Sequence, residues 1–518
     1  AVSYALQIQR FADTGEWRWL LHPHHLAFNV AGWLVYTLLN GLHLKVEPLQ
    51  ALQVMNALVG GVGVGLFAYA AGYISGDRAA GLLAGAGLGL SYGYWTCGTD
   101  GRVNLPGVVF LVVAVLVVAV LQDARRMRAP GVFARWSVLL GALHGAAVIW
   151  HQSHLLFVPA ALVALHLSPG RPRRQGVAAY LAVVVGVVLG AYMVAALLAL
   201  GGAALGGLRH WAFLYLHQGW WWSFELVRNL GKDAAALGHA LLATPAREVG
   251  VYRAARLALL AGVSLGLFRL VGVCRRGDVL VAAAGPPVAH ADPLPPVRRK
   301  AVRDMQRRLV PVLGAWVAAY ALFFTFWNPG YFVFWVPLLL PFWLVVACGL
   351  GCSRPSLARR PGWWVPALVG LGMVAVSNTV VAVAPHGQAG RNMRLQKALA
   401  AKPHLGPLDR MVVAGTGDDA DAEVYVPYFT RGGVVSVNAA MARTGGGPAG
   451  WNALSREIAG VLQRGGRVFA HEELFSSEGP YIALGERFGI QRAEMVRFFR
   501  GRYLLGRPVR WRRTVGND

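Results

Sequence analysis

The sequence has few acidic side chains, little charge of either sign and few cysteines, and each shortage excludes a class of protein. Charged residues make up 14% of the 518 residues, whereas roughly a quarter is usual for a soluble domain. A water-soluble fold for the whole chain is therefore excluded. Acidic residues number 24 against 49 lysines and arginines, which gives a net charge of +25. The four cysteines lie in or beside apolar runs, so no disulfide framework is implied.

Several motifs that would explain so basic a chain are also missing. We find no zinc-finger spacing and no RNA-binding signature, which argues against a nucleic-acid partner. No CxxCH motif for haem attachment occurs, and no internal repeat is evident. The stretch GTGDD after MVVAGT resembles a phosphate-binding turn, but it lacks the full GxGxxG pattern and the Walker lysine. An ordinary turn from a strand to a helix explains this stretch as well.

Apolar runs dominate the chain instead. Apolar residues reach 56% and the mean hydropathy is +0.47. The runs that approach the length of a membrane span lie near residues 50–74, 79–96, 103–121, 132–150, 153–168, 176–200, 251–273, 309–327, 331–352 and 363–384. The basic links between them contain Arg78, Arg125, Arg126, Arg128, Arg171, Arg173, Arg174, the segment 275–308, Arg354, Arg359 and Arg360. With ten spans, every basic link falls on one side, which the positive-inside rule makes cytoplasmic.

One further apolar run, Leu26–Leu44, would break this alternation if it crossed the membrane. Its polar residues Asn29, Tyr36, Asn40 and His43 recur at spacings of seven, four and three, which is one stripe of a helix. We therefore predict an amphipathic helix that lies at the outer surface. The first 25 residues are then also extracytoplasmic, and we expect a further span before Ala1.

The composition changes after Pro385. Segments MVVAGT, GVVSVN and RVFAHEEL have the pattern of strands, and WNALSREIAGVLQRG and YIALGERFG have that of helices. The sequence thus predicts an all-α polytopic membrane protein with about 10–11 transmembrane helices and an outer juxtamembrane helix, plus a small C-terminal α/β extracytoplasmic domain. The predicted divisions are a first outer loop at 1–49, a membrane bundle at 50–384 and the outer domain at 385–518. The link 274–308 is predicted to be a flexible linker followed by a short basic helix.

Polar side chains that lipid would not tolerate gather in the predicted outer segments. They are Asp13, Glu16, His22, His24, His25 and Asn29 before the first span, Asp100 and Arg102, His151 and His154, and Asn328. Polar groups collected at one end of a bundle, among tryptophans and tyrosines, are typical of a binding cavity. A single histidine at a membrane interface is equally well explained as an interfacial anchor.

Two of these groups indicate particular chemistry. In WTCGTDGRVNLP, Arg102 has the charge to pair with a phosphate oxygen, and Asp100 has the carboxylate needed of a general base on a hydroxyl, although a simple surface ion pair is the alternative. Three imidazoles within four residues, His22, His24 and His25, are candidates for a divalent metal, with His151 or His154 as further ligands. No two of the three have the i,i+4 spacing that a helical metal site uses.

The layout resembles the GT-C superfamily of membrane glycosyltransferases, which includes protein O-mannosyltransferases and aminoarabinose transferases. The stretch SYALQIQRFADTGEW resembles the family's first outer helix with its Gly-acid-Trp, and HPHHLAFNVAGWLVYTLLNGL resembles the proline turn and surface helix that follow. GTDGRVNL resembles the second outer loop, in which an arginine follows an acid. YFVFWVPLLLPFWLVVA resembles a late motif with two prolines four residues apart, here Pro337 and Pro341. In the family, the catalytic aspartate would fall at or just before Ala1, and a basic residue usually stands before the two prolines, where this chain has Tyr331 to Phe334.

This resemblance implies that a polyprenyl-phosphate sugar enters an outer cavity from the bilayer and gives its sugar to an unknown extracytoplasmic acceptor. Asp100, Asp13 or Glu16 would take the acceptor's proton, and Arg102 would hold the leaving phosphate, with His24, His25, Asn29, His151, His154 and Asn328 as further substrate contacts. The protein would lie in a bacterial-type inner membrane.

Three other functions compete with this one. A non-catalytic membrane subunit with the same fold would bind lipid, or a partner protein through its outer domain, and the departures at Ala1 and before the prolines favour it. A transporter predicts charges or paired repeats deep in the spans, where few charges occur. A pigment or haem protein would use a membrane histidine such as His144, but a lone histidine in a span is more often packed or hydrogen-bonded.

Overall fold

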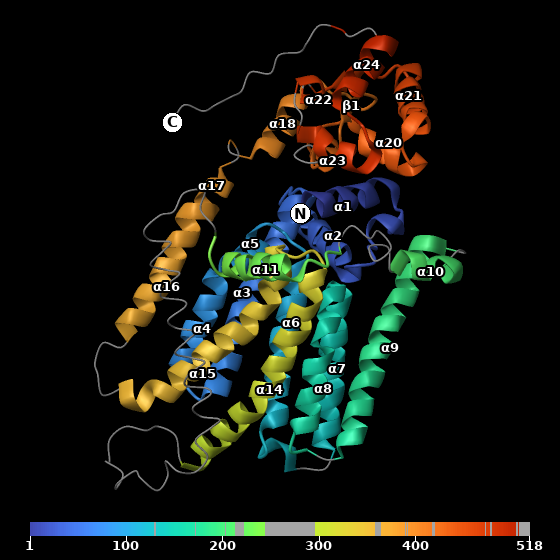
Figure 1. Cartoon of the computed structure of the whole chain (residues 1–518). Helices are drawn as coiled ribbons and strands as arrows, with labels where there is room; N and C mark the ends of the chain where they lie inside the picture. The colour runs from blue at the N-terminus through green and yellow to red at the C-terminus, as the bar shows by residue number, and fades with distance from the viewer. Residues whose placement is uncertain are drawn as a thin grey trace. The chain divides into compact units, whose positions relative to one another are not determined.

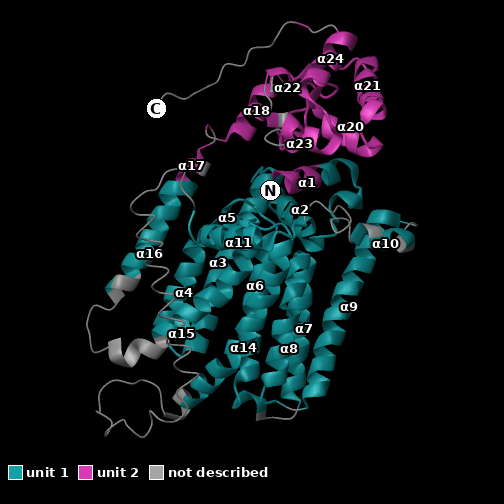
Figure 2. Ribbon diagram, in the orientation of Figure 1, with its two compact units in different colours: residues 1, 10–383 teal, residues 2–9, 384–518 magenta. Residues whose placement is uncertain are grey.

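The computed structural model describes residues 1–128, 131–170, 172–201, 204–212, 222–243, 296–357, 364–388, 390, 392–416, 420–471, 473–476, 479–503 and 506. The chain divides into two compact units (Figure 2). The helical unit holds residues 1 and 10–383, and the C-terminal unit holds residues 2–9 and 384–518. The predicted span at 251–273 and the predicted linker at 274–295 lie outside the described residues.

The secondary-structure elements described in the helical unit are all helices (Figure 1). Their bounds are α1 (Val2–Thr14, shared with the other unit), η1 (Trp17–Trp19), α2 (Leu26–Gly41), α3 (Pro48–Ser75), α4 (Arg78–Leu90), α5 (Tyr92–Thr99), α6 (Asn104–Gln122), η2 (Arg126–Arg128), α7 (Val132–Trp150), η3 (Gln152–Phe157), α8 (Val158–Leu167), α9 (Arg173–Leu200), α10 (Ala204–Ala212), α11 (Leu226–Leu241), α14 (Pro296–Phe326), η6 (Phe332–Leu338), α15 (Leu339–Leu357), α16 (Trp364–Asn378) and the π-helical turn η7 (Thr379–Val383).

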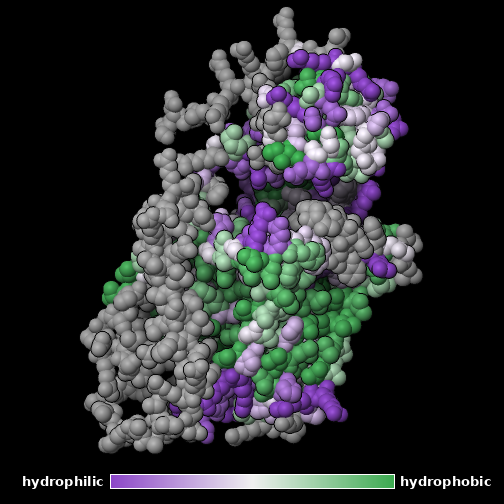
Figure 3. Space-filling view, in the orientation of Figure 1, coloured by the Kyte–Doolittle hydropathy of each residue, from purple (hydrophilic) through white to green (hydrophobic). Residues whose placement is uncertain are grey.

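Six of the described helices are long and apolar enough to cross a membrane. They cover Pro48–Ser75, Asn104–Gln122, Val132–Trp150, Arg173–Leu200, Lys300–Phe326 and Phe332–Leu350. Several carry exposed apolar side chains; Leu58 on α3 is 67% exposed and Leu189 on α9 is 59% exposed. Hydrophobic side chains cover the middle of the helical unit, with hydrophilic ones gathered at its end (Figure 3). Such a continuous apolar surface indicates contact with lipid, so the chain is a multi-pass membrane protein.

Small residues allow the helices of the bundle to approach one another closely. α3 packs against α4 and α6, α7 against α6 and α9, and α8 against α14. At the crossing of α3 and α4, a Cβ on Gly81 would lie 2.5 Å from the Ala68 carbonyl oxygen and 2.5 Å from the Gly72 nitrogen. No side chain fits there, so glycine determines how closely these two helices pack.

Four of the predicted spans are broken or shortened. The run 79–96 forms α4 and α5, which separate at Ser91, and the run 153–168 forms η3 and α8. The run 331–352 begins as the 3-10 helix η6, which contains Pro337, and the run 363–384 ends in a π-helical turn. Hydropathy detects these apolar segments but not the points at which the helices break. Those points depend on hydrogen bonds to neighbouring helices and on prolines, which lack a backbone N–H.

The juxtamembrane helix is confirmed as α2, which ends at Gly41 and has 16 residues. Of the predicted polar stripe, only Asn29 is buried against the protein; Tyr36 and Asn40 are half-buried, and His43 is exposed beyond the end of the helix. Asn29 is 1% exposed and its Nδ2 donates to the Trp19 carbonyl (3.4 Å), while Leu34 and Leu38 are 55% and 61% exposed. The exposed face of α2 is thus rich in leucine, as a helix in contact with lipid requires.

The short basic helix predicted before residue 309 is not separate. Residues 296–326 form the single helix α14, which has 31 residues and contains Pro311. The basic residues predicted to form a separate helix therefore make up the N-terminal turns of the membrane helix α14. Its Arg308 donates to the Gln122 carbonyl at the end of α6 (3.1 Å), which ties these two helices together.

The C-terminal unit is built on a three-stranded parallel sheet of order β2-β1-β3, as the strand segments predict. Its elements are α17 (Ala384–Gly387), α18 (Met393–Ala401), β1 (Arg410–Val413), α19 (Ala422–Phe429), β2 (Gly433–Ser436), α20 (Val437–Thr444), α21 (Gly447–Gln463), β3 (Val468–Ala470), α22 (Glu473–Ser476), α23 (Gly479–Phe488) and α24 (Arg492–Arg502). Side chains of β1 alternate between two apolar clusters: Met411 and Val413 pack with Val426 of α19, and Val412 packs with Leu454 of α21. Both faces of the sheet are covered, as a parallel sheet requires.

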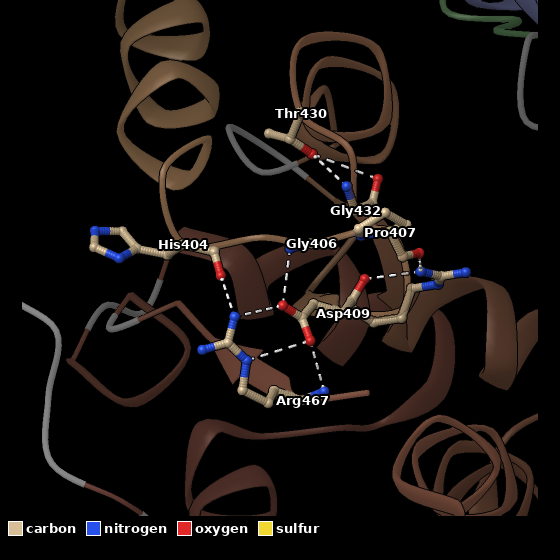
Figure 4. Close-up of polar contacts among 8 residues, drawn as sticks. His404, Gly406, Pro407, Asp409, Thr430, Gly432 and Arg467 are labelled. Carbon is tan, nitrogen blue, oxygen red and sulfur yellow. Dashed lines mark hydrogen bonds and ion pairs between the residues drawn. The ribbon is translucent and has the colours of Figure 1, made fainter. Parts of the chain in front are cut away.

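A buried carboxylate fastens the start of this sheet (Figure 4). Asp409 accepts hydrogen bonds from the backbone of Gly406 (2.8 Å) and Arg467 (2.7 Å), and from the Arg467 guanidinium (2.7 Å). The Arg467 guanidinium, followed by the backbone donors, lowers the pKa of Asp409 to about 2. A charge-assisted contact thereby joins the residues that immediately precede β1 and β3.

Candidate functional site

The first part of the site is the turn between α5 and α6. Gly101 has a left-handed backbone (φ 64°), and a Cβ there would come within 3.2 Å of the Leu52 Cβ, so glycine is required. The fully buried Asn56 of α3 donates from Nδ2 to the carbonyl oxygens of Cys97 (2.9 Å) and Arg102 (2.6 Å). α3 thus determines the shape of the turn and the direction in which Arg102 leaves it.

The turn presents an arginine that is only partly accessible. Arg102 Nε donates to Asp100 Oδ2 at 2.9 Å, and the side chains are 27% and 48% exposed. The guanidinium carbon lies 5.5 Å from the ring centroid of Phe332 and the guanidinium interacts with the Tyr331 hydroxyl. Burial disfavours the charge of Arg102, but the Cys97 thiol, Asp100 and Tyr331 outweigh this effect and raise its pKa. The guanidinium is therefore a permanent cation against an aromatic surface.

Aromatic rings from two further helices complete this surface. The rings of Tyr92 on α5 and His239 on α11 lie 5.5 Å and 4.8 Å from Phe332, and 4.8 Å from one another. Burial lowers the pKa of His239, which keeps its imidazole neutral at pH 7. We call Asp100, Arg102, Tyr331, Phe332, Tyr92 and His239 the arginine group.

A buried acid that the sequence did not reveal supports the loop before η6. Asp233 on α11 is 4% exposed and accepts a hydrogen bond from the Gly330 nitrogen at 3.2 Å. Burial raises the pKa of its carboxyl. Both Asn328 (φ 49°) and Gly330 (φ 87°) have left-handed backbones, so the loop needs such a fastening. Asn229, Asp233, Ala236 and Ala240 form the buried face of α11, which only the packing of this helix reveals.

Histidines from two distant segments form the second part of the site. The His22 and His25 rings stack at 4.6 Å between centroids, and His24 lies 5.7 Å from His22. His151 lies 5.4 Å from His25 and 5.9 Å from His154. We call these five residues the histidine cluster. Two of the segments that the sequence analysis treated separately therefore meet in one place.

Backbone contacts hold the two segments of the histidine cluster together. The Gln152 nitrogen donates to the His24 carbonyl at 3.1 Å, and the Tyr192 hydroxyl of α9 donates to the Pro23 carbonyl. His154 Nδ1 lies 3.0 Å from the Tyr320 hydroxyl of α14. The ring of His154 fits because residue 107 is glycine: a Cβ there would lie 2.4 Å from His154 Nε2.

The histidine cluster is uncharged at neutral pH. Burial lowers the pKa of His22 to about 4 and that of His151 to about 4. Burial, followed by repulsion from His22 and His151, lowers the pKa of His24 to about 3 and brings that of His25 well below its ordinary value. The cluster therefore offers hydrogen-bond donors and acceptors to a ligand, and the cation of the site is Arg102.

The predicted metal ligands have a stacked arrangement. The His22 and His25 ring planes differ by 5°, so the two rings lie face to face. Among the described residues, no group of three or more histidine, cysteine or acidic side chains has the geometry to hold a metal ion. Metal binding by His22, His24 and His25 stays a prediction.

η6 lies between the arginine group and the histidine cluster. The Phe334 ring is 5.2 Å from that of Tyr331 and 6.1 Å from that of His151. The aromatic stretch that stands where a basic residue was expected thus forms a wall shared by both groups.

The other predicted site residues lie elsewhere or act locally. Glu16 pairs with Arg18 (2.6 Å) and accepts from the Trp19 indole (3.1 Å), and Asp13 is exposed on α1. Within the described ranges, no hydrogen bond, ion pair or ring contact joins Asp13 or Glu16 to the arginine group. Asn29 is buried on α2, where it donates to the Trp19 carbonyl.

Comparison with known proteins gives structural neighbours only. No protein-family model matches the sequence, and no curated protein matches it. One similar solved structure is that of ArnT, a GT-C family aminoarabinose transferase, from Cupriavidus metallidurans bound to undecaprenyl phosphate. It has 14% sequence identity and a TM-score of 0.49, over 94% of this chain and 90% of that chain. ArnT from the same organism in the apo state has 16% identity and a TM-score of 0.44, over 94% and 89%.

Proposed function

We propose that the protein transfers a sugar from a polyprenyl-phosphate donor to an extracytoplasmic acceptor hydroxyl. The observation that carries the proposal is Arg102: its side chain is 27% exposed, bound to Asp100, and placed against an aromatic ring in the turn just before an apolar membrane helix. A lipid phosphate has the two complementary parts, an anion for the guanidinium and an apolar chain for the rings and the membrane helix.

Arg102 would bind the phosphate of the donor. Asp100 engages its Nε, and a planar guanidinium has further N–H donors that match phosphate oxygens in pairs. The rings of Phe332 and Tyr92 supply an apolar surface beside it. A cation fixed in a partly dry site stabilises the charge that develops on a leaving phosphate more strongly than it would in water.

Asp100 would serve as the general base. Asp13 and Glu16, the other candidate acids, have no described contact with Arg102, whereas Asp100 is its direct partner. When a donor phosphate binds the remaining N–H groups, its negative charge weakens the hold of the guanidinium on Asp100, whose carboxylate is then able to accept a proton from the acceptor hydroxyl.

The reaction then balances without a further reactant. The acceptor oxygen bonds to the anomeric carbon while its proton passes to Asp100, and the bond from that carbon to the phosphate oxygen breaks. The polyprenyl phosphate leaves with the electron pair, held by Arg102. The histidine cluster and Asn328 would contact the sugar or acceptor through neutral hydrogen bonds. By the positive-inside rule, this site would lie on the outer face of an inner membrane.

The test is turnover of radiolabelled polyprenyl-phosphate sugars by the full chain in proteoliposomes, together with binding of undecaprenyl phosphate. We expect Arg102→Ala to lower kcat/KM by about a hundredfold or more, and Arg102→Lys by less. The matched control is Arg18→Ala, which removes an arginine from the exposed pair with Glu16 and leaves turnover within about twofold.

Three outcomes bear on the proposal. Loss of turnover in Asp100→Asn with lipid binding intact supports Asp100 as the base. Turnover that is unaffected by Arg102→Ala refutes the proposed clamp. Lipid binding without turnover of any donor refutes the enzyme and leaves the non-catalytic membrane subunit, which binds lipid or a partner protein. Turnover before and after chelator treatment separately tests the predicted divalent metal.

A further inference from the structure

The C-terminal unit carries an open groove that the proposed transfer reaction does not use. Its volume is about 830 Å³, and it lies between α23 and α24. The side chains that line it are of two kinds, cationic and apolar. The cationic ones are Arg492, Arg497 and Arg500, and the apolar ones include Phe475, Ile482 and Val496.

The arginines of the groove form a row. Arg492 and Arg500 are eight residues apart on α24, which is about 12 Å along a helix. Arg497 and Arg500 are exposed, and neither has an ion pair among the described residues. Arg492 donates to the Ser476 carbonyl at 3.3 Å, which turns it toward the edge of the groove. The acid on this helix, Glu494, is occupied in the cap at its first turn.

An apolar surface accompanies this row of charge. Ile482 on α23 is 66% exposed within the groove, although most isoleucines are buried. A row of guanidinium groups beside exposed apolar side chains matches a ligand that joins an anion to an apolar chain.

The chain's own continuation is not that ligand. The sequence after α24 carries Arg507, Arg510, Arg512 and Arg513, and its single acid is Asp518. This segment has the same sign of charge as the groove and would be repelled by it. We therefore look for an anionic occupant other than this C-terminal segment.

We propose that the groove binds the headgroups of anionic phospholipids. The C-terminal unit follows directly after η7, the end of an apolar helix at 368–383, so the chain tethers it to a bilayer. Anionic lipid is the anion that such a tether supplies at high local concentration, and a negatively charged membrane surface attracts basic residues close to it. This site is separate from the arginine group and does not depend on catalysis.

The experiment uses the full chain in nanodiscs of phosphatidylcholine, with or without phosphatidylglycerol. Hydrogen–deuterium exchange is followed by mass spectrometry over residues 479–502. We expect phosphatidylglycerol to slow exchange of the α24 amides about fivefold or more, because a bound headgroup stabilises the closed helix. Arg497→Gln/Arg500→Gln removes this difference. The matched control, Arg456→Gln/Arg464→Gln, changes the same charge in the same unit and keeps it.

Other results would overturn the proposal. Equal exchange in the two kinds of nanodisc would show that no anionic headgroup occupies the groove. A loss of the difference in the control variant as well would show a general effect of net charge. Slowing in phosphatidylcholine nanodiscs on addition of inorganic polyphosphate, with none from phosphatidylglycerol, would assign the groove to a soluble polyanion. Thermal unfolding of each variant in detergent establishes that its fold is intact.

Discussion

Acid should open the histidine cluster, because its imidazoles are held neutral by burial. His22 has a pKa of about 4 in the folded protein, against about 6.5 for a free imidazole. A histidine with a lowered pKa stabilises the closed form fully above its ordinary pKa. That contribution is lost as the pH falls from about 6.5 toward about 4, since the open form binds more protons throughout this range.

The magnitude follows from the proton count. Between pH 7.5 and pH 5.5, one imidazole that titrates only in the open form raises the opening constant about tenfold, or about 1.4 kcal/mol. The pKa of His24 falls to about 3 and that of His151 to about 4, so they contribute in the same direction. Repulsion among cations in the open form lowers the sum, so we expect an increase of about a hundredfold for the whole cluster.

Hydrogen–deuterium exchange of residues 19–26 and 151–157 in the full chain measures this opening, after correction for the intrinsic pH dependence of amide exchange. His22→Gln should reduce the pH dependence by about one proton. The control is His404→Gln in the C-terminal unit, whose ring points away from the Asp409 contacts (Figure 4) and which should change nothing in these segments. A pH-independent opening constant, or a slope that His22→Gln leaves unchanged, would refute the reasoning.

Two further predictions concern stability. Asp409→Asn removes the buried carboxylate at the start of the sheet and should destabilise the C-terminal unit by about 2 kcal/mol. The control Glu457→Gln, in an exposed ion pair, should cost less than about 0.5 kcal/mol. Amide exchange of β1 and β3 measures both losses of stability. Because the pKa of Asp409 is lowered to about 2, its contribution should persist above about pH 4 and disappear as the pH falls toward 2. Gly107→Ala places a Cβ 2.4 Å from His154 Nε2 and should cost about 1–3 kcal/mol in thermal unfolding. Gly61→Ala, with no atom within 4 Å of the new Cβ, should be neutral or slightly stabilising, and an equal loss in both glycine variants would contradict the packing argument.

Much of the fold was readable from the sequence. The apolar runs at 103–121, 132–150 and 176–200 are single helices within one or two turns of their predicted bounds. They were predictable because a helix that spans lipid requires a long apolar stretch, and few other structures do. The three strands of the C-terminal unit were equally clear, since β-branched residues between turn residues leave few alternatives. The breaks in four spans were not, because they depend on hydrogen bonds with neighbouring helices.

The candidate site divides in the same way. The pair of Asp100 and Arg102 could be proposed from the sequence because the two residues are neighbours in one turn. Asp233 and His239 could not, because α11 has the pattern of an ordinary amphipathic helix and only packing reveals which of its polar residues are buried. Asn56 is likewise polar within an apolar run, and its role is visible only when its two carbonyl partners are brought to it.

The sequence by itself determined that this is a multi-pass membrane protein with a small α/β unit, since hydropathy and local pattern are properties of neighbouring residues. The tertiary structure alone decided that His25 meets His151 and that Phe332 covers Arg102, across separations of more than a hundred residues. Those contacts depend on how closely the helices pack. Glycines such as Gly81 and Gly107 allow the close packing because they have no side chain.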